Sequence, residues 1–213
     1  MKIQILIMAG LVWTGIATAG GKVTLTTGHT DMGVVYDNGE FTMDIHYDVT
    51  DTAYPAKQVI LFVSKIAMTT VPSDPVYNFL GPAGAPVWIL PQVQDPTLLF
   101  LGFGSDELPA GVFQNDTVRI QLKDVKGPGE FAMFASDPFG IPIPIMNTRD
   151  GISADDVYPF VAGSDAHFNF AFSKPGKYRV TLETTGTLPD GTVISTGDVT
   201  YTFRVARAGS PEL

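Results

Sequence analysis

The chain has 213 residues, 45% hydrophobic and 16% charged, and its 22 acidic against 13 basic side chains give a formal net charge of −9 at neutral pH. So apolar a composition excludes intrinsic disorder, and an acidic chain without a basic run excludes nucleic-acid binding, which needs clustered Lys and Arg. The chain has no cysteine and three histidines. Disulfides and thiolate metal sites are therefore excluded, and a metal site must use imidazole, carboxylate or carbonyl ligands.

The first 19 residues have the three-part layout of a secretory signal peptide. Lys2 precedes an apolar stretch over residues 3–16, and the Ala-Thr-Ala of residues 17–19 is the small-residue pattern that precedes cleavage. A membrane anchor is the alternative, but the stretch is shorter than the roughly 20 residues that span a bilayer. We expect cleavage after Ala19 and a secreted, periplasmic or cell-surface protein with no stable membrane span. Export without cysteine favours a bacterial source.

From Lys22 onward, apolar and polar residues alternate with a period of two, and Gly, Pro, Asn or Asp interrupt the alternation about every 8 to 15 residues. This pattern is typical of antiparallel strands. Further strands are expected at residues 58–63, 117–122, 129–135, 166–172, 176–184 and 198–205, the last two joined by a turn at 188–192. Because no linker or repeat divides residues 20–213, we predict one all-β domain, an immunoglobulin-like antiparallel β-sandwich.

The clearest hairpin covers residues 30–48. It turns at Asn38-Gly39, the pair that a two-residue type I′ turn prefers. With these two residues as the loop, Tyr36 faces Phe41 and Asp31 faces His46, and the side chains separate onto two faces. The core face holds Met32, Val34, Tyr36, Phe41, Met43 and Ile45, and the opposite face collects His29, Asp31, Asp44, His46 and Asp48.

Residues 71–113 break the alternation with many prolines and glycines and a high density of large apolar side chains, Trp88 among them. A segment this apolar is not a solvated loop. We expect an ordered insertion whose aromatic residues cap the open end of the sandwich. The alternative is that these aromatic residues form a platform for a glycan or a protein.

Several blocks carry a family resemblance. They are Gly28-His29-Thr30-Asp31 ahead of the Tyr-Asp-Asn-Gly hairpin, residues 71–81, 87–96 and 127–130, and the block from His167 to Val180. The last block is similar to the signature His-x-Asn-Trp-x-Phe-x-x-Pro-Gly-x-Tyr of the choice-of-anchor M domain, also called the actinobacterial surface-anchored protein domain. The chain resembles this family over nearly all of its length after the expected leader.

The resemblance implies an exported protein at the cell surface, and some family members accompany ABC transporters of the metal-uptake type. No activity is settled for the domain itself. This chain departs from the family pattern at Phe170, where tryptophan is usual, and at Asp165, where a second histidine often stands. It also carries no anchor motif after Arg207.

All three histidines fall inside stretches that carry the resemblance. The hairpin register places His29 and His46 on one face with Asp31, and His167 alternates with phenylalanines and so points away from the core. Imidazole together with carboxylate suits Zn²⁺, Cu²⁺ or Mn²⁺, and Asp31 or Asp44 can fix the tautomer of a ligand histidine. We predict a transition-metal site of His29, His46 and His167 with Asp31. The alternative is three separate histidines, each hydrogen-bonded to a nearby aspartate.

No catalytic arrangement emerges from the sequence. Asp155 and Asp156 are adjacent and would point to opposite faces of a strand, and the chain contains no G-x-S-x-G motif. We therefore predict a non-enzymatic cell-envelope protein that binds a transition metal and is associated with metal-uptake transport. The alternative function is a structural or adhesive module that binds glycan or protein through residues 71–113.

Overall fold

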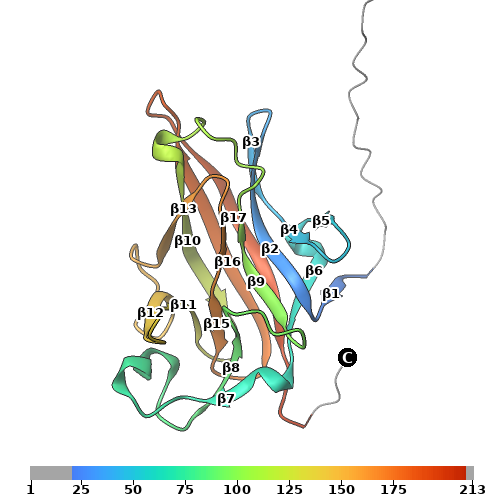
Figure 1. Ribbon diagram of the computed structural model, residues 1–213, viewed down its shortest axis with the longest axis vertical. Coiled ribbons are helices and arrows are strands. Elements are labelled where there is room, and N and C mark those ends of the chain that lie inside the picture. The colour runs from blue at the N-terminus through green and yellow to red at the C-terminus, as the bar shows by residue number, and fades with distance from the viewer. Residues whose placement is uncertain (1–20, 210–213) are drawn as a thin grey trace, which may run out of the picture.

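A computed structural model describes residues 21–209, and over this range the protein is all-β (Figure 1). The expected signal peptide, residues 1–19, lies outside the described residues. Three sheets and four short 3₁₀ helices make up the described structure. Within it, no helix is long and apolar enough to cross a membrane.

The first sheet, here called the long sheet, contains the two longest strands. Its order is β1 (Val23–Leu25), β6 (Val59–Val63), β17 (Val193–Val205), β16 (Gly176–Thr187), β10 (Thr117–Lys126) and β13 (Val157–Val161). β16 and β17 pair antiparallel from Gly176 opposite Val205 to Thr187 opposite Val193. The turn at 188–192 and the closing antiparallel pair are thus confirmed.

Two smaller sheets complete the fold. The site sheet has the order β14 (Asp165–His167), β9 (Leu99–Gly104), β2 (Gly28–Asp37), β4 (Ile45–Tyr47) and β5 (Thr52–Tyr54), with β3 (Glu40–Met43) paired to β2. The third sheet has the order β12 (Pro142–Asn147), β11 (Phe131–Ser136), β15 (Asn169–Phe172), β8 (Pro86–Leu90) and β7 (Met68–Thr70). One hydrophobic core takes buried side chains from all three sheets.

An antiparallel sandwich was predicted, but the sheets also contain parallel strand pairs. β6 pairs parallel with both β1 and β17, and β2 pairs parallel with β9. Hairpin connections give only antiparallel neighbours, so these parallel pairs join strands that are distant in the chain. The immunoglobulin-like pattern of strands remains a prediction.

The hairpin register is as predicted. Tyr36 is opposite Phe41 and Asp31 is opposite His46. Asn38 and Gly39 both have positive φ, at 48° and 87°, which a type I′ turn requires. The core face of the hairpin is buried, so the opposite face presents His29, Asp31 and His46 together.

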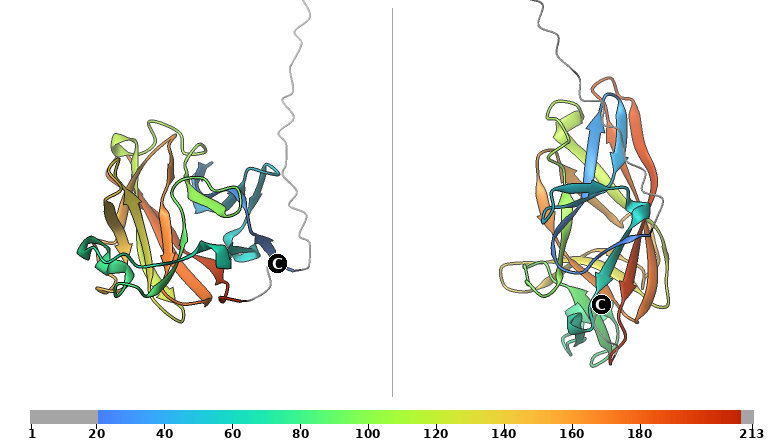
Figure 2. Two further views of the ribbon diagram at one scale, coloured as in Figure 1. Left: turned by 60° about the horizontal axis from the view of Figure 1, so that its bottom comes forward. Right: turned by 90° about the vertical axis from the view of Figure 1, so that its right-hand side faces the viewer.

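Residues 71–113, expected to form an ordered insertion, take part in two of the sheets. This segment supplies β8 inside the third sheet and β9 inside the site sheet. Both strands are continuous apolar runs without alternation, and most of their residues are buried. Trp88 is 3% exposed and packs in the core, so it forms no open platform. The part around the helix η3 (Pro75–Leu80) lies at the end of the molecule away from the β2–β3 hairpin (Figures 1 and 2).

The predicted strand at 166–172 is divided at Phe168. β14 belongs to the site sheet and β15 to the third sheet, so the chain changes sheets between His167 and Asn169. Asn169 is buried and donates to the carbonyl oxygen of Phe134. His167 therefore joins the site sheet without Asn169.

Candidate metal centre

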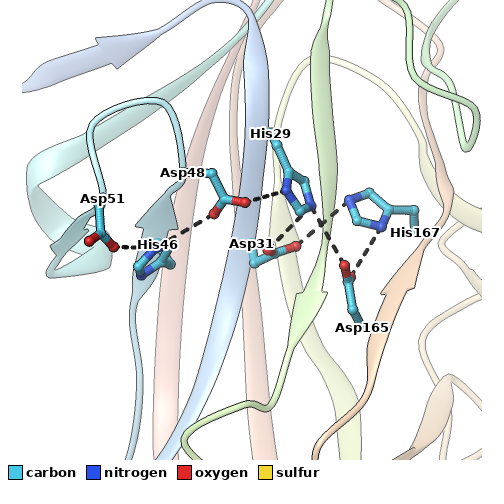
Figure 3. Close-up of polar contacts among 7 residues, drawn as sticks. All are labelled: His29, Asp31, His46, Asp48, Asp51, Asp165 and His167. Atoms are coloured by element: carbon cyan, nitrogen blue, oxygen red, sulfur yellow. Dashed lines mark hydrogen bonds and ion pairs between the residues drawn. The ribbon is translucent and has the colours of Figure 1, made fainter.

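Three neighbouring strands of the site sheet position the cluster (Figure 3). β2 provides His29 and Asp31, and β14 provides Asp165 and His167, each pair two residues apart and so on one face. β9 lies between these strands, and its Gly102 aligns with Asp31 on one side and with His167 on the other. Residues from the two ends of the chain thereby face each other across one strand.

Gly102 leaves the space in which these side chains meet. A Cβ atom at this position would lie 2.9 Å from Nε2 of His167, 3.0 Å from Oδ1 of Asp31 and 2.8 Å from the carbonyl oxygen of Ala166. Any larger residue would force the facing side chains apart. A glycine at position 102 of β9 is thus a structural requirement of the cluster.

The four side chains can hold a metal ion. One ligand atom from each of His29, Asp31, Asp165 and His167 lies within 4.8 Å of the other three. Nε2 of His29 is 3.4 Å from Oδ2 of Asp31, and Nε2 of His167 is 3.8 Å from Oδ1 of Asp31. Ligands about 2.0 to 2.2 Å from one ion at tetrahedral angles are about 3.3 to 3.6 Å apart, close to this spacing.

Three of these atoms are buried without a hydrogen-bond partner. They are Nε2 of His29, Oδ1 of Asp31 and Nε2 of His167. Buried polar atoms almost always have a partner, and here three unpartnered atoms that accept an ion converge on one point. Asp31 is itself only 8% exposed. A cation is the partner that would satisfy all three atoms at once.

Asp48 orients His29. A carboxylate oxygen of Asp48 contacts Nδ1 of His29, so we assign the imidazole proton to Nδ1 and the free lone pair to Nε2, which faces the cluster. This carboxylate–histidine contact is common behind metal ligands. Asp31 and Asp44 were the residues predicted for this role. Asp31 instead lies among the ligand atoms, and Asp44 lies against Gly33.

His46 does not join the cluster, contrary to the predicted ligand set. Its Nε2 lies 3.5 Å from Oδ1 of Asp48 and 3.4 Å from Oδ1 of Asp51. β4 lies on the side of β2 opposite β9, so His46 reaches Asp48 but not the group of four ligand residues.

The structure brings together three of the predicted ligands, His29, Asp31 and His167. It adds Asp165, which was not among the predicted ligands. Asp165 lies 3.7 Å from Nε2 of His29 and 3.2 Å from Nδ1 of His167. Its spacing of two from His167 was the signal that could have identified it.

Aromatic packing holds the imidazoles. The ring of Phe100, on β9, stacks on His167 with centroids 3.7 Å apart and planes 9° apart. The same ring lies 5.3 Å from His29, and the two imidazoles are 4.7 Å apart. Phe100 therefore restricts the orientation of both histidines.

Without a cation, the cluster is electrostatically unfavourable. Burial raises the pKa of Asp31 from 3.8 to about 6, and the nearby carboxylates of Asp165 and Asp48 add to this effect, while His29 opposes it. Burial is also the main reason that the pKa of His167 is lowered. His167 is thus held in the neutral form that binds metals, and a divalent ion would balance two ionised aspartates.

A cleft of about 500 Å³ opens beside the cluster. Three of the four ligand residues line it, whereas His167 does not. The described residues that line this cleft include seven carboxylates and no Lys or Arg. The full lining is His29, Asp31, Gly33, Val34, Val35, Asp44, His46, Asp48, Asp51, Gly104, Asp106, Glu107 and Asp165.

The fold and the cluster together define an all-β protein with a two-histidine, two-aspartate group that can hold a metal ion. Comparison with protein-family models, with curated proteins and with solved structures finds no match. The resemblance to the choice-of-anchor M domain therefore stays a prediction based on the sequence motifs.

Proposed function

We propose that the protein is an exported, non-enzymatic binding protein of the cell envelope that holds one divalent transition-metal ion through His29, Asp31, Asp165 and His167. The observation that carries this proposal is the convergence of three buried, unpartnered ligand atoms from β2 and β14. The expected leader and the family resemblance support export and an association with metal-uptake transport.

The donor set narrows the choice of ion. Two neutral imidazoles and two carboxylates form a complex of zero net charge with a divalent ion, and this mixture suits Zn²⁺, Mn²⁺ or Cu²⁺. The cluster contains no sulfur ligand, so it does not favour Cu⁺, which prefers thiolate or thioether.

Metal content measured by mass spectrometry tests the proposal. Protein purified without chelators is expected to carry about one ion per chain, and the His29→Ala/His167→Ala variant is expected to carry none. His46→Ala is the matched control, because His46 contacts Asp48 but lies outside the cluster, and it should keep its ion. Circular dichroism checks that each variant is folded. Equal metal content in the wild type and the double variant would contradict the proposal.

The alternative function, adhesion through the aromatic residues of 71–113, lacks a supporting observation. Glycan platforms need exposed ring faces. Trp88, Phe103 and Phe113 are buried in the core, and Tyr77, Phe79 and Phe100 are only partly exposed.

A further inference from the structure

The cluster has a covered side and an open side. Phe100 stacks on His167, and His167 does not line the cleft. His29, Asp31 and Asp165 do line it. An ion held by these four residues therefore meets protein on the side of His167 and the cleft on the other side.

The cleft is larger than an ion requires. One water takes about 30 Å³ of liquid volume, and small-molecule sites in proteins measure about 300 to 1,000 Å³. At about 500 Å³, the cleft lies in the second range. It has room for a small molecule beside the ion.

The charge of the cleft selects its occupant. Two carboxylates, of Asp31 and Asp165, balance a divalent ion, and five further carboxylates line the walls: Asp44, Asp48, Asp51, Asp106 and Glu107. No Lys or Arg stands among the described lining residues to offset them. The field at the open side of the ion is therefore negative, which disfavours an anion and favours a neutral or cationic molecule.

The rest of the lining agrees with a cationic or neutral occupant. Burial and the proximity of Glu107 raise the pKa of Asp44 to about 6, while His46 opposes this effect. The aliphatic side chain of Val35 also lines the cleft, beside the carboxylates.

We propose that the ion, held by the four residues, keeps one face open to this cleft and binds there, as a fifth ligand, the neutral nitrogen of a small neutral or cationic molecule of the amine or imidazole class, rather than a carboxylate or another anion. This inference rests on the proposed metal centre. It implies that the ion is exchanged as a complex with a nitrogen-rich chelator and not with a citrate-like one.

Exogenous ligands provide the test. Protein loaded with Co²⁺ is titrated with imidazole and, separately, with azide at constant ionic strength, and the visible absorption of the ion is followed. Imidazole should shift the spectrum in a saturable manner, and azide should require at least about tenfold higher concentration because of the negative field. Metal content after gel filtration shows that imidazole has not removed the ion.

A charge variant sharpens the test. Asp106→Asn removes one charge from the exposed cleft wall outside the cluster and should strengthen azide binding by about two- to fivefold. Asp155→Asn is the matched control, because Asp155 is exposed and lies elsewhere, and it should change nothing.

Two results would overturn the inference. One is azide binding as strong as imidazole binding, and the other is stoichiometric Co²⁺ whose spectrum neither ligand changes, which means a closed site. Failure of the proposed function is distinguishable, because the protein would then take up no Co²⁺.

Discussion

Asp31 lies between the two histidines of the cluster and contacts both with different oxygens. Its burial makes the ionised carboxylate unfavourable in the metal-free protein. Asp31→Asn should therefore abolish metal binding and yet stabilise the metal-free protein by about 1 to 2 kcal/mol at neutral pH. Urea denaturation in the presence of a chelator measures this change. A metal-free variant less stable than the wild type would show that the carboxylate contributes to folding.

In the proposed metal centre, Asp48 would act on the ion through its contact with His29. Asp48→Asn should weaken metal affinity by about 10- to 100-fold, since the imidazole loses the group that fixes its tautomer. Asp51→Asn is the control, because Asp51 contacts His46 and not His29, and asparagine accepts its positive φ of 48°. Calorimetric titration with Zn²⁺ compares the two variants. Equal affinities in both would exclude the orienting role of Asp48.

Asp44 makes stability depend on pH. Burial, and then Glu107, raise its pKa from 3.8 to about 6. The folded protein therefore binds the proton of the Asp44 carboxyl group more tightly than the unfolded chain does. The stabilisation that this proton gives to the folded state is complete below about pH 4 and is lost as the pH rises through about 6. Asp44→Asn should be more stable than the wild type by about 1 kcal/mol at pH 7 but not at pH 4. Chemical denaturation with a chelator at both pH values checks this, and a difference independent of pH would contradict it.

Among the strands, β9 decides whether the site can form. Gly102→Ala places a Cβ where His167 and Asp31 meet, while its backbone conformation suits alanine. We expect a folded protein that has lost metal binding, measured by metal content and circular dichroism. Gly21→Ala is the control, because no atom lies near the added Cβ. Retention of the ion by Gly102→Ala would mean that the ligands do not meet across β9.

Local signals in the sequence were sufficient to predict the hairpin but not to predict β9. The Asn38-Gly39 turn and strict alternation set the register from Asp31 to His46, because both signals lie within a few residues of the pairing. β9 is apolar along its whole length and contains two glycines, so it shows no alternation of apolar and polar residues, and the glycines weaken its strand propensity.

The ligand set was predicted in part for the same reason. His29 and Asp31 follow from the hairpin register, but the choice between His46 and Asp165 depends on which strand lies beside β2 on each side. That order is set by parallel pairing with β9, a contact between distant parts of the chain that alternation does not encode. The change of sheet at Phe168 was likewise not visible, since alternation continues through it.

For the whole molecule, an ion in the proposed site would link β2 and β14, two strands far apart in the sequence. An ion that binds only the folded state adds about 2.7 kcal/mol at a free concentration one hundred times its dissociation constant. For a domain of this size, this corresponds to a rise in melting temperature of about 5 to 10 °C. Differential scanning calorimetry with and without Zn²⁺ should show this rise in the wild type but not in the His29→Ala/His167→Ala variant. A similar rise in both would place the stabilising ion elsewhere.

The position of the ion tests the metal centre most directly. Crystals grown with Zn²⁺ should give one strong anomalous-scattering peak about 2.0 to 2.1 Å from Nε2 of both His29 and His167, with oxygens of Asp31 and Asp165 in contact. A peak between His46 and Asp51 with none at the cluster, or no peak at all, would contradict the assignment of these four residues as the metal centre.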